Sequence, residues 1–159
     1  MKKFELTTES ITFLGRTLFR IKALISFGNV KAGELGGYIE KEGNLSYEGN
    51  AWVFGNARVY GNAEVCGNAR VCGNARVCGN AEVFGNADIA TISGFGSEYR
   101  TTTFFRTKNN EIAVKCGCFY GTLAEFREKV KETHGDNRYA KEYLMIADLM
   151  EMHFRGEEE

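Results

Sequence analysis

The feature that most constrains this chain is a six-residue period that runs from Leu45 to Ile89. Units of the form small–variable–aliphatic–variable recur there, and a Gly-Asn pair precedes each regular unit. Alternation within a unit puts alanine and valine on one side, where small side chains suit a narrow interior. Glycine and asparagine tolerate left-handed backbone conformations, so each pair can turn a corner. Self-similarity at a fixed short period predicts a parallel β-helix.

The units resemble the hexapeptide repeats of left-handed β-helices, in which three units make one triangular turn. The resemblance implies that residues eighteen apart stack on one face, and that corner asparagines stack and exchange side-chain hydrogen bonds. An antiparallel meander is the alternative interpretation. In a meander, strands of about four residues would bury little apolar surface. In a wound chain, equivalent residues of successive turns stack on one another. The sequence therefore favours the wound arrangement.

A second resemblance extends into the N-terminal half. Four segments are similar to a family of small repeat proteins that is common in bacteriophages and prophages and whose molecular role is mostly unassigned: residues 18–24, 33–40, 44–46 and 51–53. The similarity spans roughly residues 18–90. It implies that the chain acts in the cytoplasm of an infected or lysogenic bacterial host.

The expected fold class is mainly β, a short left-handed parallel β-helix with a small C-terminal α+β module. We expect capping strands over residues 1–44, the hexapeptide-repeat body over 45–97 and the module over 98–155. The capping strands would cover the end of the repeat body, which otherwise exposes apolar faces and unpaired edges. Residues 156–159 are expected to be a disordered tail.

Within the module, residues 101–107 and 112–119 predict a β-hairpin. Thr122 and Glu125 form a capping box at the start of a helix that should end at Gly135. A second helix is expected over about residues 137–154. Its apolar stripe consists of Tyr143, Ile146, Ala147 and Met150.

Composition narrows the possible functions of the 159-residue chain. A net charge of −1 gives no reason to expect non-specific nucleic-acid binding. No apolar run is long enough to cross a membrane, and acids and threonines follow Lys2 and Lys3 where a signal peptide needs an apolar stretch. The five cysteines cannot all pair within one chain, and their spacing does not indicate a disulfide framework. Free thiols agree with a cytoplasmic location.

Histidines and cysteines offer little for catalysis or metal binding. Left-handed β-helix acyltransferases use a histidine general base, and a related hydrolyase group binds zinc through three histidines. This chain has only His134 and His153, both outside the repeats. Cys116 and Cys118 would share a strand face, but a zinc site needs two further ligands. We therefore expect no catalytic residue, metal or cofactor, with an acyltransferase using His134 as its base as the alternative.

The outward positions of the units carry the candidate binding residues. Like charges stacked at the strand spacing repel one another unless something compensates them. An arginine face that meets a glutamate face of another subunit would compensate both and would specify a homotrimer. Two solvated faces are the alternative, but outward aromatic residues favour a contact surface. The candidate ligand- and interface-binding residues are Trp52, Phe54, Arg58, Tyr60, Glu64, Arg70, Arg76 and Glu82.

The leading hypothesis is a non-enzymatic, oligomeric phage or prophage binding protein that acts as a counter-defence inhibitor. It would sequester a small anionic ligand of nucleotide type or block a host protein. Arginine offers a planar fork for phosphates, and aromatic rings stack on bases. The alternatives are the acyltransferase and a structural virion or scaffold element.

Overall fold

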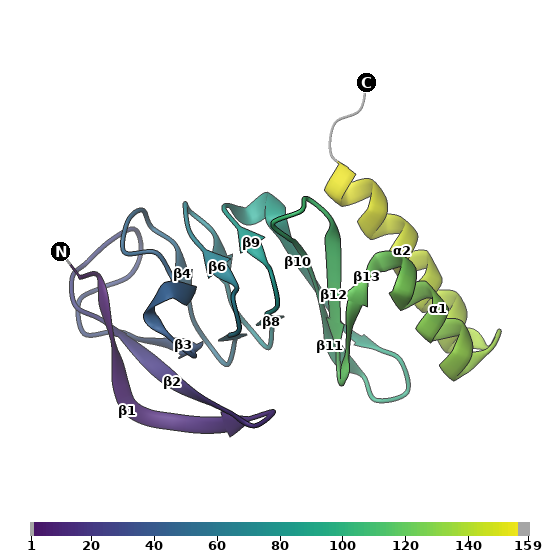
Figure 1. The fold of residues 1–159 in the computed structure, drawn as a ribbon, viewed down its shortest axis with the longest axis horizontal. Coiled ribbons are helices and arrows are strands. Elements are labelled where there is room, and N and C mark those ends of the chain that lie inside the picture. The colour runs from purple at the N-terminus through teal and green to yellow at the C-terminus, as the bar shows by residue number, and fades with distance from the viewer. Residues whose placement is uncertain (1, 156–159) are drawn as a thin grey trace.

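The computed structural model describes residues 2–155, so the predicted tail lies outside the described residues. An N-terminal hairpin, the repeat region (residues 45–90), an antiparallel sheet and two helices follow one another along the long axis of the molecule (Figure 1). The strands are β1 Phe4–Phe13, β2 Arg16–Ala23, β3 Leu35–Ile39, β4 Trp52–Val53, β5 Arg58–Val59, β6 Glu64–Val65, β7 Arg70–Val71, β8 Arg76–Val77, β9 Glu82–Val83, β10 Ile89–Phe95, β11 Arg100–Arg106, β12 Ile112–Cys116 and β13 Phe119–Thr122, and the helices are α1 Leu123–His134 and α2 Arg138–Arg155.

The expected fold class, a mainly β protein built on a regular left-handed parallel β-helix, is wrong. The fold is mixed α/β, with two helices and several small sheets that neither close nor continue as a solenoid. A Gly-Asn corner every six residues leaves only two residues of each unit in strand conformation. Strands β4 and β7 form one two-stranded sheet, and β6 and β9 form another. The third pair, β5 and β8, extends a sheet whose other strands are β1, β2 and β3.

Pairing between units eighteen residues apart is confirmed. Arg58 lies opposite Arg76, Glu64 opposite Glu82, and Trp52 opposite Arg70, each in a parallel pair. The expected asparagine ladders are wrong in their bonding. Between residues 2 and 155, no corner asparagine bonds through its side chain to the asparagine stacked on it; backbone bonds such as Asn56 N–H to the Gly73 carbonyl, 3.1 Å, link the corners instead.

The alanines and valines of the first six units form the buried interior of the repeat region. The seventh unit departs from the pattern, because a 3-10 turn at Asn86–Asp88 leads directly into β10. Beyond it, β11 closes the end of the repeat interior. Phe105 packs on the repeat core, whereas its neighbour Phe104 packs on the other face against the helices. The β10–β13 sheet is thus covered on both faces.

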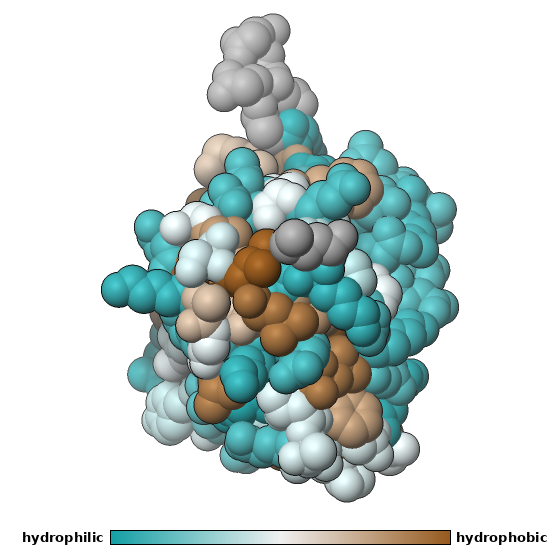
Figure 2. All heavy atoms as spheres, turned by 90° about the vertical axis from the view of Figure 1, so that its left-hand side faces the viewer, coloured by the Kyte–Doolittle hydropathy of each residue, from teal (hydrophilic) through white to brown (hydrophobic). Residues whose placement is uncertain are grey.

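The N-terminal segment covers the other end and one side of the repeat region. Strand β3 pairs antiparallel with β2 and parallel with β5, which joins the hairpin to the repeats. The Phe27 ring packs edge-on against Trp52, with 5.3 Å between centroids. Apolar side chains gather on the outer face of this end of the molecule (Figure 2). The segment therefore shields the repeats while presenting an apolar surface of its own.

Local signals placed the two helices correctly. Thr122 accepts a hydrogen bond from the Glu125 N–H, and the Glu125 carboxylate accepts one from the Thr122 N–H, which is the predicted capping box. Gly135 ends α1 with φ of +68°. The predicted stripe of α2 is buried against the sheet and α1. Neither helix of the described chain is long and apolar enough to cross a membrane.

Candidate anion-binding site

Two stacked arginines share one aromatic ring. Arg58 on β5 and Arg76 on β8 are opposite each other in parallel strands. Phe13, the last residue of β1, reaches over both of them. Its ring centroid lies 4.4 Å from the Arg58 guanidinium carbon and 4.7 Å from that of Arg76. Cation–π contact offsets part of the repulsion between the two charges, but it adds no negative charge.

Arg100, the first residue of β11, completes a group of three that we call the arginine cluster: Arg58, Arg76 and Arg100. The pKa of Arg76 is lowered, first by burial and then by the positive charges of Arg58 and Arg100. The C-terminal sheet therefore brings a third cation to the pair that the repeats build. The lowered pKa has a direct physical meaning: the surroundings of Arg76 disfavour its charge.

No carboxylate in the described part of the chain forms an ion pair with this cluster, although Glu98 lines the same cavity as Arg100. The three guanidinium groups make no hydrogen bond or ion pair with any residue between 2 and 155. Other arginines of the chain are paired, for example Arg106 with Asp88 at 2.8 Å and Arg16 with Glu40 at 2.9 Å. Cationic groups that crowd together without a counter-charge are stabilised by a bound anion.

Arg100 lines two cavities. A polar cavity of about 250 Å³ is lined by Arg76 and Arg100 together with Asn74, Tyr99 and Thr101. The second cavity, of about 340 Å³, lies between the sheet and the helices and is more apolar. Arg100 is thus the one residue that the linings of the two cavities share, and it lies between a polar and an apolar space.

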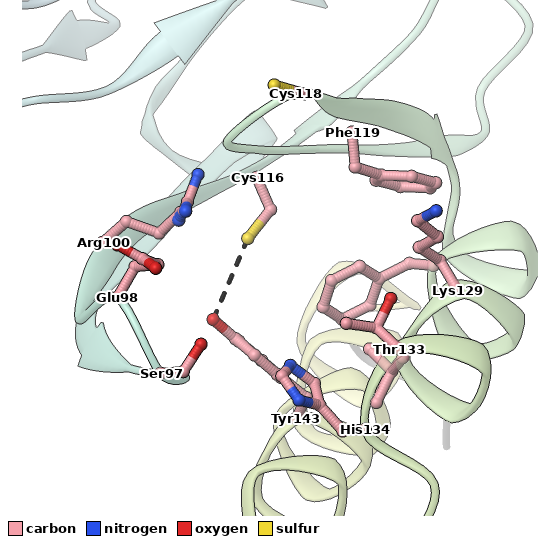
Figure 3. Close-up of a pocket in the computed structure, with 12 residues that line it drawn as sticks. Ser97, Glu98, Arg100, Cys116, Cys118, Phe119, Lys129, Thr133, His134 and Tyr143 are labelled. Carbon is pink, nitrogen blue, oxygen red and sulfur yellow. Dashed lines mark hydrogen bonds between the residues drawn. The ribbon is translucent and has the colours of Figure 1, made fainter.

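The larger cavity combines an apolar wall with polar groups around it (Figure 3). Phe119 and Lys129 lie on the side of β13 and α1, whereas Arg100 lies across the cavity from them. The Cys116 thiol points inward, 3.9 Å from the Tyr143 hydroxyl. Burial, followed by the charge on Cys116, raises the pKa of Tyr143 to about 12, so the phenol stays neutral. This cavity suits a flat or aliphatic body.

His134 lies at the end of α1 and lines the same cavity. Its ring stacks on Tyr143, with 6.2 Å between centroids. His153 lies near the end of α2, where its ring contacts Phe154. The acyltransferase alternative, with His134 as its base, stays a prediction.

The structure separates the sequence-predicted binding residues into distinct surroundings. Trp52 and Tyr60, expected to face a partner, are only 1% and 4% exposed, because the N-terminal segment covers them. They cannot touch a partner without rearrangement. Arg70 is exposed and lies over the Phe54 ring, 4.9 Å from its centroid.

The predicted glutamates lie on another face. Glu64 forms an ion pair with Lys108, with 3.2 Å between carboxylate oxygen and ammonium nitrogen. Glu82 is half-buried and has no ion pair among residues 2–155. Of the eight predicted residues, the structure thus brings only Arg58 and Arg76 to the arginine cluster, with the buried Tyr60 beside them.

The cysteine pair is not arranged as expected. Cys116 ends β12, and Gly117, with φ of +59°, turns the chain before Cys118. The two thiols therefore do not share a strand face, and Cys118 is exposed while Cys116 points into the larger cavity. Within residues 2–155, no group of three histidine, cysteine, aspartate or glutamate side chains could hold a metal ion.

Sequence reasoning missed Arg100. The residue stands just outside the predicted strand over residues 101–107, and no period relates it to the repeats. Only the crossing of β11 over the end of the repeat region puts it near Arg76.

No protein-family model matches the chain, and the comparison with curated proteins finds no match. The resemblance to the phage and prophage family therefore stays a prediction, and the counter-defence role drawn from it has no support.

Proposed function

We propose that this protein binds a small phosphate-bearing ligand of nucleotide type at the arginine cluster, without chemical conversion of that ligand. One observation carries the proposal: three arginines that form no ion pair in the described chain line or adjoin a polar cavity, and one of them, Arg100, also lines an apolar cavity. Guanidinium groups bind phosphate through paired hydrogen bonds, and charged hydrogen bonds are stronger than neutral ones. The bound anion would remove the repulsion within the cluster.

The two cavities suit the two parts of such a ligand. A phosphate would lie between Arg76 and Arg100, which both line the 250 Å³ cavity. A base would lie against Phe119 and Phe126 in the 340 Å³ cavity, where aromatic side chains supply stacking surfaces. Compensation by a ligand requires no neighbouring subunit, so the proposal holds for a monomer or an oligomer.

The test is isothermal titration calorimetry with adenosine monophosphate as the probe. We expect saturable binding by the wild type that weakens as salt increases, because salt screens the charges. Arg76→Gln and Arg100→Gln should each weaken binding at least about tenfold, since a charged hydrogen bond contributes roughly 1.5–3 kcal/mol. Circular dichroism would establish that both variants are folded.

Arg70→Gln is the matched control, because Arg70 holds the same position in its unit as Arg76 but lies on another face. It should leave the affinity unchanged. Adenosine, which lacks the phosphate, should bind far more weakly. Equal weakening by Arg70→Gln, or no saturable binding by the folded wild type, would contradict the proposal. Conversion of the recovered nucleotide would contradict its non-enzymatic part.

A further inference from the structure

A second candidate site lies away from the arginine cluster and centres on Lys115. This lysine lies on β12 between Val114 and Cys116, and alternation turns it toward the repeat region together with Ala113. Its side chain is buried, and the residue is only 5% exposed. Within residues 2–155, it makes no hydrogen bond and no ion pair. The ammonium nitrogen itself is not among the fully buried, unpartnered side-chain atoms of the described chain, so it remains accessible to a small anion.

Lys115 lines a cavity of about 400 Å³. The tip of the β1–β2 hairpin supplies Leu14 and Arg16, and the corners of the repeat region supply Asn62 and Asn80. Tyr120 of β13, the strand partner of Lys115, forms a further wall. The cavity thus combines apolar surfaces with amide groups and two cations, and its walls come from three separate parts of the fold.

Only one of the two cations lacks a counter-charge. Arg16 donates to both carboxylate oxygens of Glu40, at 2.9 and 3.2 Å. Glu40 also accepts a hydrogen bond from the Gly61 N–H at 2.9 Å, which holds it in place. The charge of Arg16 is therefore balanced, whereas that of Lys115 is not.

The remaining titratable groups around the cavity do not supply the missing negative charge. Burial raises the pKa of the Cys78 thiol and of the Tyr60 and Tyr120 phenols. All three are therefore neutral at ordinary pH. One uncompensated positive charge calls for one negative charge, so a monoanion fits this cavity better than a doubly charged phosphate.

We propose that this cavity binds a small monocarboxylate. The Lys115 ammonium would bind the carboxylate, and Leu14 and the Tyr120 ring would contact an apolar body. The amide groups of Asn62 and Asn80 offer further hydrogen bonds at the rim. This site shares no residue with the arginine cluster, so it stands or falls independently of the proposed nucleotide binding.

The experiment is a titration with sodium benzoate, followed by calorimetry and by the thermal unfolding temperature. We expect saturable binding and a rise in the unfolding temperature with benzoate concentration, since a ligand of the folded state stabilises it. Lys115→Met keeps an unbranched side chain, one atom shorter, and removes the charge. It should weaken benzoate binding at least about tenfold, because the charged hydrogen bond is lost.

Lys108→Met is the matched control, because Lys108 is an exposed lysine in the loop before β12, outside the cavity. It should bind benzoate like the wild type, as should Arg100→Gln, which tests the arginine cluster. If Lys115→Met fails to fold, the benzoate-dependent rise in the wild-type unfolding temperature still decides. No saturable binding, unchanged binding by folded Lys115→Met, or tighter binding of inorganic phosphate than of benzoate would overturn the proposal.

Discussion

The arginine ladder (Arg58 and Arg76) and the glutamate ladder (Glu64 and Glu82) hold equivalent positions in neighbouring units, yet their surroundings differ. Each ladder consists of two like charges in a parallel pair of two-residue strands. The arginine ladder belongs to a five-stranded sheet, because the N-terminal strands extend it. The glutamate ladder belongs to a two-stranded sheet. The repeat therefore sets the position of each charge, and the non-repeating segments set what surrounds it.

The two ladders are also compensated differently. Lys108, in the loop after β11, forms an ion pair with Glu64. This pair lies at the surface and therefore contributes little to stability. The arginine ladder instead lies against the Phe13 ring and near a third arginine, Arg100, and it pairs with no acidic residue in the described chain. A solvated like-charged pair is tolerable, whereas a partly covered one attracts a counter-ion more strongly. This difference is why we place the ligand at the arginines.

Replacing the glycine at the corner after each ladder by alanine should give the largest difference in stability between the two regions. Gly61 and Gly67 follow the first arginine and first glutamate units, with φ of +68° and +65°. A Cβ atom at Gly67 would clash with the carbonyl oxygen of Phe84. A Cβ atom at Gly61 would lie 3.2 Å from its nearest neighbour, the backbone nitrogen of Gly79, which is a tight contact but not a clash. Gly67→Ala should lower the free energy of unfolding by about 3 kcal/mol, and Gly61→Ala by about 1–2 kcal/mol. Urea unfolding measures both, and equal losses would show that the corners are equivalent.

Removing the ring over the arginine ladder should have the next largest effect. Phe13 contacts Arg58, Arg76 and Tyr60, the last edge-on with 5.4 Å between centroids. Phe13→Ala should lower the free energy of unfolding by about 2 kcal/mol, from lost burial and lost aromatic contacts. Phe84, 51% exposed in the unit of Glu82, is the control, and Phe84→Ala should cost less than about 0.5 kcal/mol. Thermal or urea unfolding of both variants would decide, and a smaller loss for Phe13→Ala would show that the hairpin does not stabilise the ladder.

The sequence predicted those parts of the fold that depend on local or periodic signals. A six-residue period is enough to pair Arg58 with Arg76, and a capping box is enough to start α1 at Thr122. The regular β-helix was wrong because the period does not show how few residues of each unit adopt strand conformation. The strands over residues 1–44 were predicted only as a region, and β10 and β13 were not predicted as separate strands, because these segments carry no repeat.

The candidate sites were predictable only in part, for the same reason. Arg58 and Arg76 follow from the period, but Arg100 reaches them through the crossing of β11 over the repeats. The hairpin tip that buries Tyr60 is also a long-range contact. Lys115 is one residue of a short alternating strand, and the sequence does not show which side of that strand meets the repeat region.

Thiol reactivity should give the smallest but most local difference between the ladders. The pKa of Cys66 is raised by burial first, and then by the negative charges of Glu64, Glu82 and Asp88. Because the thiolate is the reactive form, alkylation of Cys66 by iodoacetamide should reach half its maximal rate above the ordinary pH for a thiol. Glu82→Gln removes one of these charges, so it should move that midpoint to lower pH and raise the rate at pH 8 about twofold.

Peptide mass spectrometry can follow each cysteine of the same sample. Cys72 is exposed and lies on the face of Arg70, so its rate should not change in Glu82→Gln. Cys78, beside the arginine ladder, is buried and should react most slowly in both proteins, because access limits it. An unchanged Cys66 profile would mean that the charge of Glu82 contributes nothing measurable to the raised pKa. The Glu82 carboxylate would then be so well screened by solvent that it exerts no measurable field on its neighbour, which would make the contrast with the covered arginines greater.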